Sequence, residues 1–264
     1  MKKKPANPAD IGLAVHGLTV RDARKQTVVD HISFEVRAGE ILGIAGVQGN
    51  GQTELTEALL GLKAEVSGDI VLNGRNLAGC STREVLTAGV GYVPEDRQQD
   101  GLVASFSIAE NLMLDRFDGE PFVHRGGLRP GLLRQFAEDK IREFDVRAQS
   151  SGTPVGQLSG GNQQKVVLAR ELSRDLTLFV ASQPTRGVDV GSIEFIHQQI
   201  VATRDAGIPV IVISTELDEV IALSDRIAVM YRGHIVGIVP ATTSRDVLGL
   251  MMAGDTAAGL EHAG

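Results

Sequence analysis

Apolar residues along the chain follow two patterns that alternate with each other. Short runs rich in β-branched residues predict strands, and the stretches between them carry apolar residues at helical spacing. The expected strands are Ala14–Val20, Ile32–Val36, Glu40–Ala45, Asp69–Leu72, Val90–Val93, Thr177–Ala181, Pro209–Ser214, Arg226–Tyr231 and His234–Val239. The expected helices are Gly51–Leu62, Arg83–Ala88, Ile108–Leu114, Leu132–Phe144, Gly160–Ser173, Ser192–Asp205, Glu216–Leu223 and Ser244–Met252. This alternation is typical of an α/β fold with a mostly parallel central sheet, in which we expect the first few strands and the last two to be antiparallel.

The strand pattern stops between about residue 103 and residue 174, where only helical spacing remains. We therefore expect a helical lobe inserted into an α/β domain that covers residues 11–252. Residues 1–10 carry three lysines and two prolines without an apolar run, which favours a loose N-terminal arm with solvated lysines. Residues 253–264 have little apolar surface to bury and are expected to form a loose C-terminal tail.

Composition and charge narrow the class of protein further. The 26 Lys and Arg residues against 33 Asp and Glu residues give a net charge of −7, which argues against a nucleic-acid partner. Hydrophobic residues make up 42% and charged residues 22%, as in ordinary globular proteins. No apolar run approaches the roughly 18 residues that a membrane-spanning helix needs. The single cysteine, Cys80, permits no internal disulfide and favours a reducing, cytoplasmic compartment.

The first candidate site follows the predicted strand Glu40–Ala45. There the sequence Gly46-Val47-Gln48-Gly49-Asn50-Gly51-Gln52-Thr53 matches the phosphate-loop pattern G-x-x-x-x-G-K-[S/T] except at Gln52. Glycines allow backbone N–H groups to converge on a phosphate, and the helix N-terminus adds about half a positive charge. Gln52 can donate a hydrogen bond but lacks the charge of lysine, so we expect nucleotide binding to persist and phosphoryl transfer to suffer. A glycine-rich turn without a ligand is the alternative interpretation of this loop alone.

The second candidate site opens a predicted helix with Leu158-Ser159-Gly160-Gly161-Asn162-Gln163-Gln164-Lys165. Ser159 suits a helix N-cap, and the two glycines allow N–H groups to approach an anion closely. This run resembles the signature motif of the ATP-binding domains of ABC transporters, and the phosphate loop lies at the distance upstream that the family shows. The resemblance implies ATP and Mg²⁺ as ligands. The fold that it implies is an α/β P-loop ATPase core with a mixed, mostly parallel sheet, an N-terminal antiparallel β portion and an inserted helical lobe.

Five residues depart from the family at positions that contact the metal or the reacting groups, and they are Gln52, Glu95, Ser182, Gln183 and Glu216. The resemblance implies that Ser182 and Gln183 replace an aspartate that would hold the Mg²⁺ shell and a glutamate that would polarise the attacking water. It also implies that Glu216 replaces a switch histidine and that Glu95 replaces a glutamine that reaches Mg²⁺. We therefore expect a degenerate site with no intact catalytic residue. Magnesium would be held weakly, through Thr53 and Glu95.

Domains of this family work as head-to-tail pairs, in which the phosphate loop of one domain faces the signature helix of the other. The signature here is intact from Leu158 to Gln163. The resemblance therefore implies that this chain completes the site of a paired ABC ATP-binding domain. Arg186 and Asp189 resemble the family's short loop that contacts the opposite domain.

The motifs together are similar to those of the second, C-terminal ATP-binding domain of tandem-domain importers for simple sugars or nucleosides. This resemblance implies that the paired domain lies in the same longer chain, and that membrane permease subunits and, indirectly, a substrate-binding protein are partners. It places the protein in the cytoplasm, on the inner face of the cell membrane. The assembled importer would hydrolyse ATP, whereas activity of the isolated domain stays open. Two alternatives are a soluble ABC-type ATPase outside transport and an interaction module that no longer binds nucleotide.

Overall fold

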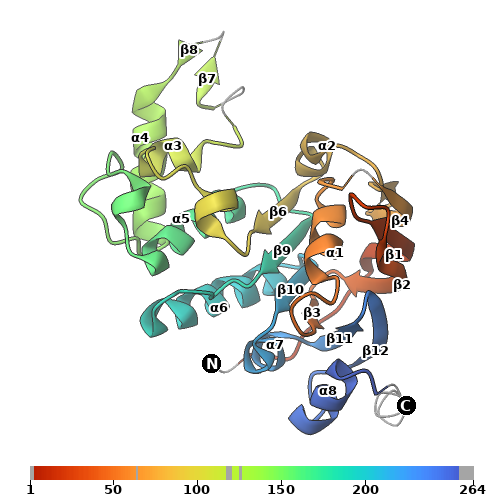
Figure 1. The fold of residues 1–264 in the computed structure, drawn as a ribbon. Helices are drawn as coiled ribbons and strands as arrows, with labels where there is room; N and C mark the ends of the chain where they lie inside the picture. Colours follow the sequence, from red (N-terminus) through yellow and green to blue (C-terminus); the bar gives the residue numbers. More distant parts are fainter. Residues whose placement is uncertain (1–2, 64, 117–120, 125–126, 256–264) are drawn as a thin grey trace. The chain divides into compact units, whose positions relative to one another are not determined.

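The computed structural model describes residues 3–63, 65–116, 121–124 and 127–255. Figure 1 shows the elements in chain order. The strands are β1 (Ile11–Arg21), β2 (Thr27–Arg37), β3 (Ile41–Ala45), β4 (Val66–Leu72), β5 (Arg75–Asn76), β6 (Val90–Val93), β7 (Val123–His124), β8 (Gly127–Leu128), β9 (Leu178–Ser182), β10 (Val210–Ser214), β11 (Arg226–Tyr231) and β12 (His234–Pro240). The helices are α1 (Gln52–Leu59), α2 (Thr82–Thr87), α3 (Ile108–Leu112), α4 (Pro130–Glu143), α5 (Gly160–Leu172), α6 (Val190–Asp205), α7 (Leu217–Leu223) and α8 (Arg245–Met252), with a π-helical turn η1 (Arg97–Gly101) and a 3₁₀ turn η2 (Val155–Gln157).

The chain divides into two compact units. Unit 1 comprises Met1–Tyr92, Asp175–Gln183 and His197–Gly264, and unit 2 comprises Val93–Arg174 and Pro184–Ile196. Unit 2 is wider than the helical lobe expected at residues 103–174, because it begins ten residues earlier and includes a segment that follows β9.

Unit 1 contains a six-stranded sheet with the strand order β12-β11-β3-β10-β9-β6. β3 pairs in parallel with β10 and β11, β10 pairs in parallel with β9, and β11 and β12 form an antiparallel edge. Every residue of β3, β9 and β10 is buried, as expected of parallel strands that are covered on both faces. The candidate residues of unit 1 lie at the carboxyl ends of these three strands. This edge of the sheet is where open α/β sheets bind ligands.

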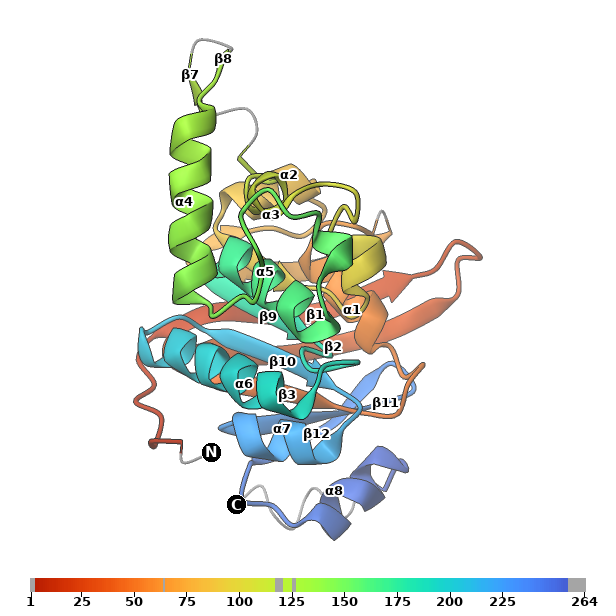
Figure 2. The ribbon, with the colours of Figure 1, turned by 90° about the vertical axis from the view of Figure 1, so that its left-hand side faces the viewer.

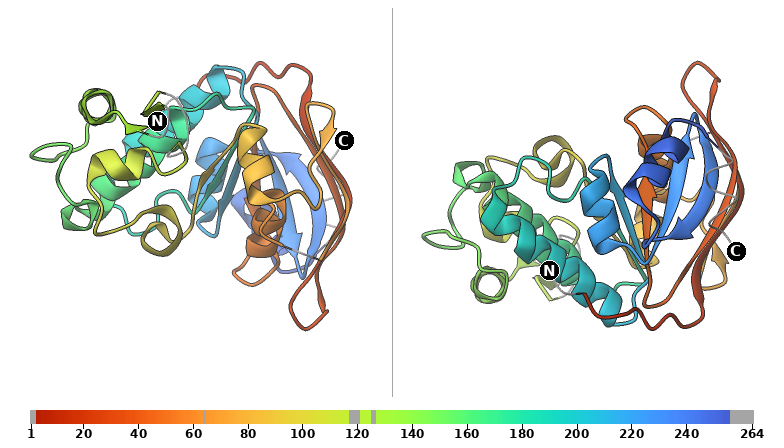
Figure 3. Two further views of the ribbon diagram at one scale, coloured as in Figure 1. Left: turned by 90° about the horizontal axis from the view of Figure 1, so that it is seen from above. Right: turned by 90° about the horizontal axis from the view of Figure 1, so that it is seen from below.

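A second, antiparallel sheet of unit 1 has the order β2-β1-β4-β5. Leu55 and Leu59 of α1 belong to one hydrophobic core with Val15 of β1 and Leu42 of β3. Seen from above and below, the long red strands β1 and β2 face the blue strands β11 and β12 across this core (Figure 3). The expected antiparallel pairing at both ends of the chain is confirmed.

The two last helices of unit 1 pack on the six-stranded sheet, where α7 contacts β3 and β10 and α8 contacts β11. Val220 of α7 and Leu248 and Met251 of α8 pack with Ile227 and Val229 of β11 in a separate hydrophobic cluster. Figure 2 shows α7 and α8 beside these strands. Residues 253–255 extend the end of α8 by main-chain hydrogen bonds to its carbonyl groups, and the rest of the tail expected at 253–264 lies outside the described residues.

Unit 2 is built on α3, α4 and α5, which contact one another. The short hairpin β7–β8 lies at the N-terminal end of α4 (Figure 2). This hairpin is not predictable from the sequence, because strands of two residues have no alternating pattern of apolar and polar positions. In the part of the chain that the structure describes, no helix has both the length and the apolarity that crossing a bilayer requires.

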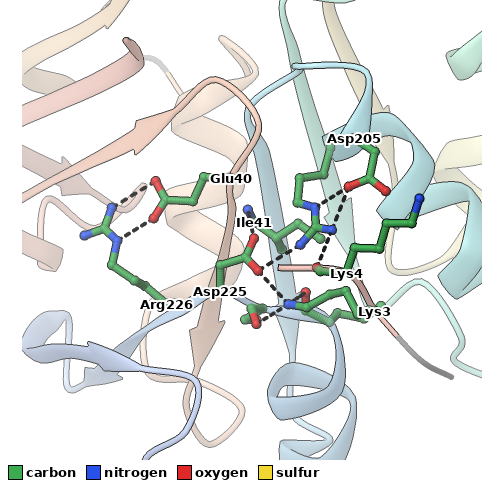
Figure 4. Close-up of polar contacts among 10 residues, drawn as sticks. Lys3, Lys4, Glu40, Ile41, Asp205, Asp225 and Arg226 are labelled. Carbon is green, nitrogen blue, oxygen red and sulfur yellow. Dashed lines mark hydrogen bonds and ion pairs between the residues drawn. The ribbon is translucent and has the colours of Figure 1, made fainter. Parts of the chain in front are cut away.

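The start of the described chain is bound to unit 1 through a buried ionic cluster (Figure 4). The Nζ of Lys3 donates to Asp225 Oδ1 at 2.7 Å and to two main-chain carbonyl oxygens at the end of α7. Arg204, whose side chain is 0% exposed, donates to Asp225 Oδ1 at 2.9 Å and to the main-chain oxygen of Lys4 at 3.0 Å. Burial lowers the pKa of Lys3. The expectation of a loose arm with solvated lysines is therefore wrong at Lys3, because acceptors at this end of α7 bind its ammonium group.

Candidate functional site

Glycine geometry and contacts to the turn after β11 fix the loop between β3 and α1. Gly49 and Gly51 have φ angles of +85° and +102°, in the left-handed region that favours glycine. The main-chain oxygen of Asn50 accepts a hydrogen bond from the N–H of Gly233 at 3.0 Å, and its Oδ1 accepts one from the N–H of Arg232 at 2.9 Å. The structure thus has the strand, loop and helix that the phosphate-loop pattern requires.

Gln52 turns its side-chain amide into this loop. The residue is only 6% exposed, and its Nε2 is buried without a hydrogen-bond partner among the described residues. A Cβ placed on Gly46 would lie 2.5 Å from this Nε2, so the amide occupies space that only glycine leaves open. An unpaired buried donor costs about 1–3 kcal/mol, which a phosphate oxygen as acceptor would recover.

The first turn of α1 offers further donors. Gly51 is the N-cap and supplies no side-chain acceptor to the helix, so the first N–H groups of α1 lack a cap hydrogen bond. Thr53, in the same turn, is solvent-exposed. Together with Gln52, this geometry fits the binding of a phosphate group.

The end of β9 carries a hydroxyl and an amide. Ser182 is 5% exposed, and Gln183 has a φ of +48°, which is uncommon for a residue other than glycine. The Nε2 of Gln183 donates to Thr215 Oγ1 at 3.2 Å, and its Oε1 accepts from Ser214 Oγ at 3.4 Å. The amide therefore ties the ends of two neighbouring parallel strands, and an amide cannot act as a general base.

Glu216 follows β10 at the position that the sequence analysis assigned to a switch residue. It is the exposed N-cap of α7, without a side-chain hydrogen bond to the helix, and its N–H donates to Ser214 Oγ at 3.0 Å. An ionised carboxylate only accepts hydrogen bonds, so Glu216 cannot bind a phosphate oxygen as an imidazole N–H would.

The described residues do not fit Mg²⁺ well. No group of three or more His, Cys, Asp or Glu side chains in the described ranges is placed to hold a metal ion. Thr53 of unit 1 contributes a single hydroxyl. Glu95 lies in unit 2, where its carboxylate forms an ion pair with Arg186. Because Mg²⁺ is usually held through one or two carboxylates, neither residue that the sequence suggested gives the ion an adequate site.

The signature residues form a capped helix start in unit 2. Ser159 is the exposed N-cap of α5, and its Oγ accepts from the N–H of Asn162 at 3.5 Å and from Asn162 Nδ2 at 2.9 Å. Leu158 immediately precedes this cap, and the Nε2 of Gln163 donates to the main-chain oxygen of Val155 at 3.3 Å. The N-cap role expected for Ser159 is confirmed.

Both glycines of the signature are required by close packing within unit 2. A Cβ on Gly160 would lie 2.7 Å from the main-chain oxygen of Gly187. A Cβ on Gly161 would lie 2.3 Å from both Asp189 Oδ2 and Ser192 Oγ. The segment from Arg186 to Ser192 therefore lies directly against the start of α5.

Asp189 and Arg97 hold this segment in place. Asp189 Oδ1 accepts from the N–H of Ser192 at 3.1 Å, and the hydroxyl of Ser192 lowers the pKa of the aspartate. Arg97 donates hydrogen bonds from Nη1 to the main-chain oxygen of Arg186 at 2.7 Å and from Nη2 to that of Gly187 at 3.0 Å. Burial lowers the pKa of Arg97. No motif in the sequence predicts this role of Arg97, because its partners lie about ninety positions away.

The model of the ABC transporter family matches residues 29–186, more than half of the sequence. The chain belongs to the ABC transporter family. Members of this family bind ATP and Mg²⁺.

Curated relatives of this ABC chain are import proteins. The chain is 45% identical over 256 residues to the guanosine import ATP-binding protein NupO of Bacillus subtilis, covering 97% of this chain and 50% of that protein. It is 44% identical over 254 residues to the nucleoside import ATP-binding protein NupA of Lactococcus lactis, covering 96% and 50%. A ribose import ATP-binding protein, RbsA, of the same species is 39% identical over 226 residues, covering 85% and 46%. The chain spans about half the length of the curated relatives it matches.

Solved ABC cassettes share the fold. A nucleotide-free ATP-binding cassette superimposes with a TM-score of 0.76 at 19% identity, over 95% of this chain and 97% of that one. The dimeric structure of the cassette MJ0796 gives a TM-score of 0.73 at 20% identity, over 88% and 100%. The predicted ABC ATPase fold is therefore confirmed.

Proposed function

We propose that this chain is the ATP-binding half of an ABC importer for nucleosides or simple sugars. It binds nucleotide in a degenerate loop of its own and supplies the start of α5 to the site of a paired ABC domain. The names of the relatives, which import guanosine, nucleosides and ribose, support the substrate class. Their length supports a paired domain in the same longer protein, since this chain spans about half of each. The resemblance of the motifs to a second, C-terminal domain supports placing this chain as the second half. Membrane permease subunits and a substrate-binding protein complete the assembly, on the inner face of the membrane.

One contrast carries this proposal. The start of α5 is fully formed and presents Ser159 to solvent, whereas β9 ends at Ser182 and is followed by Gln183, and neither side chain carries a charge. A domain that depended on its own hydrolysis would need charged groups at the end of β9. A domain that serves a partner needs only its signature helix.

The residues of the two sites then act differently. At the paired site, Ser159 Oγ and the first N–H groups of α5 donate hydrogen bonds to phosphate oxygens and stabilise the charge that develops there. At its own loop, Gln52 and the first turn of α1 bind phosphate oxygens, but Gln183 takes no proton from an attacking water. Loss of one transition-state contact typically costs about 10²–10³ in rate, so a site that lacks the cation, the metal carboxylate and the base has no useful turnover.

Replacing Ser159 with aspartate in the assembled importer tests this proposal. Aspartate is also a favoured N-cap, so Ser159→Asp keeps α5 folded while it places a negative charge where we expect the partner's nucleotide. We expect steady-state ATPase activity to fall by about tenfold or more.

The matched control is Ser244→Asp, which makes the same change at the N-cap of α8 in unit 1. This control should keep normal turnover. Unchanged turnover in Ser159→Asp would show that α5 does not serve a partner site.

A further inference from the structure

We infer that the loop from Gly46 to Thr53 binds the phosphate groups of a nucleotide without a divalent cation. This inference rests on the proposed function, since it names the form in which the degenerate site takes its ligand. It goes further because it separates nucleotide binding at this loop from magnesium altogether.

The end of β9 provides no ligand for the ion. Ser182 is only 5% exposed and offers a hydroxyl, and a neutral hydroxyl does little to offset the cost of dehydrating Mg²⁺. The side-chain oxygen of Gln183 already accepts hydrogen bonds from Ser214 Oγ and the N–H of Thr215, both at 3.4 Å. The last residue of β9 thus offers one neutral hydroxyl, and the residue that follows it offers an amide that already forms other hydrogen bonds.

Glu95 is engaged as well. Its Oε1 accepts a hydrogen bond from Arg186 Nη1, and the guanidinium neutralises the carboxylate. Arg97 donates a hydrogen bond to the main-chain oxygen of Arg186. The ion pair is therefore part of the segment from Arg186 to Ser192 that packs against α5. Binding of a cation to Glu95 would have to compete with this guanidinium.

The loop instead offers neutral donors. Among the described residues, the Nε2 of Gln52 has no hydrogen-bond partner, and the residue is 6% exposed. The first turn of α1 adds main-chain N–H groups with no side-chain cap. Such donors bind phosphate oxygens directly, without a metal ion that bridges the protein and the phosphate. The positive end of α1 supplies the remaining electrostatic attraction.

Isothermal titration of this chain with ATP and with ADP tests the inference. Each nucleotide is titrated once in excess Mg²⁺ and once in excess EDTA. We expect the two dissociation constants for a nucleotide to agree within about threefold. A loss of affinity of more than about threefold in EDTA would overturn the inference while leaving the proposed function intact.

The paired variants Ser182→Asp and Ser182→Asn sharpen the test. Aspartate restores a carboxylate at the end of β9, so we expect Mg²⁺ to tighten nucleotide binding by about tenfold in Ser182→Asp. Asparagine has nearly the same shape without the charge, and Ser182→Asn should show no magnesium effect. A magnesium effect of that size in the wild type and in Ser182→Asn, which lack the new carboxylate, would contradict the inference.

The remaining outcome is the absence of nucleotide binding in either buffer. It would overturn this inference together with the nucleotide-binding part of the proposed function. This outcome would not affect the proposed role of α5 at a partner site, which the Ser159→Asp variant tests separately.

Discussion

Gln183 stands at the position of a catalytic glutamate, but its side chain forms hydrogen bonds that hold the structure together. Its backbone lies in the left-handed region at φ +48°, and its amide joins Ser214 and Thr215 at the end of β10. The conformation is strained for a residue with a Cβ, and it persists because the surrounding hydrogen bonds hold it. The position that resembles a catalytic glutamate therefore has a structural role in this protein.

This role leads to a prediction for Gln183→Glu. We expect this variant to leave the ATPase activity of the chain at background, because the new carboxylate would still accept hydrogen bonds from Ser214 and Thr215. The lysine charge missing at Gln52 and the metal carboxylate missing at Ser182 would also remain absent. Phosphate release is the measurement, with Gln183→Ala as the control. A rise of about tenfold over both the wild type and the control would contradict the structural role.

At this scale the sequence predicts chemical types well and contacts poorly. The neutral residues at positions 52, 182 and 183 are read directly from the motifs. The ion pair between Glu95 and Arg186 joins residues 91 positions apart, and nothing local indicates it. Glu95 was therefore expected near a metal, whereas its partner in the structure is a guanidinium.

At the scale of elements, the start of α5 and the segment from Arg186 to Ser192 are packed too closely to admit a side chain at Gly161. We expect Gly161→Ala to lower the stability of unit 2 by about 1–3 kcal/mol, because Asp189 and Ser192 must move away from the new Cβ. Thermal unfolding followed by circular dichroism measures this loss.

Gly249 in α8 provides the matched control. It is also helical, and a Cβ placed there meets nothing within 4 Å. Gly249→Ala should therefore raise stability by about 0.5–1 kcal/mol, since alanine is the better helix former. Equal effects of the two alanine substitutions would show that packing at Gly161 is not the constraint.

Most long elements were predictable, and their ends were less so. The helix expected at Gly160–Ser173 is α5, which ends one residue earlier. The helix expected from Ser192 begins at Val190, because Asp189 accepts the N–H of Ser192 and allows an earlier start. β5, β7, β8 and the turns η1 and η2 were missed, since each is too short for a periodic pattern.

At the scale of the whole molecule, contacts between the two ends of the sequence stabilise unit 1. Lys3 and Asp225 are separated by 222 positions, and the buried Arg204 joins the same carboxylate. Asp225 also accepts the N–H of Ile41 through its Oδ2 at 2.9 Å, which links the cluster to β3. Sequence patterns are local, so they do not predict this cluster, and residues 1–10 have the pattern of a loose arm.

The cluster predicts a strong effect for Asp225→Asn. This substitution leaves Arg204 and Lys3 without their shared negative partner in a buried position, and we expect a loss of about 3–5 kcal/mol. Urea unfolding gives the measurement. Asp205→Asn is the control, because Asp205 binds the same arginine but is 44% exposed, and it should cost less than about 1 kcal/mol. A similar loss in both variants would contradict the importance of the buried carboxylate.

The close packing around Gly160 and Gly161 means that their conservation among related sequences would report on the fold and not on nucleotide binding. The atoms that lie against both glycines belong to this chain, so the pair is needed whether or not a nucleotide ever arrives. A lineage that had abandoned transport would keep both glycines for as long as it kept its fold. Ser159 is different, because threonine, asparagine or aspartate would cap α5 nearly as well. If α5 serves a paired domain as proposed, the serine is therefore a better record than the glycines of continued selection for that role.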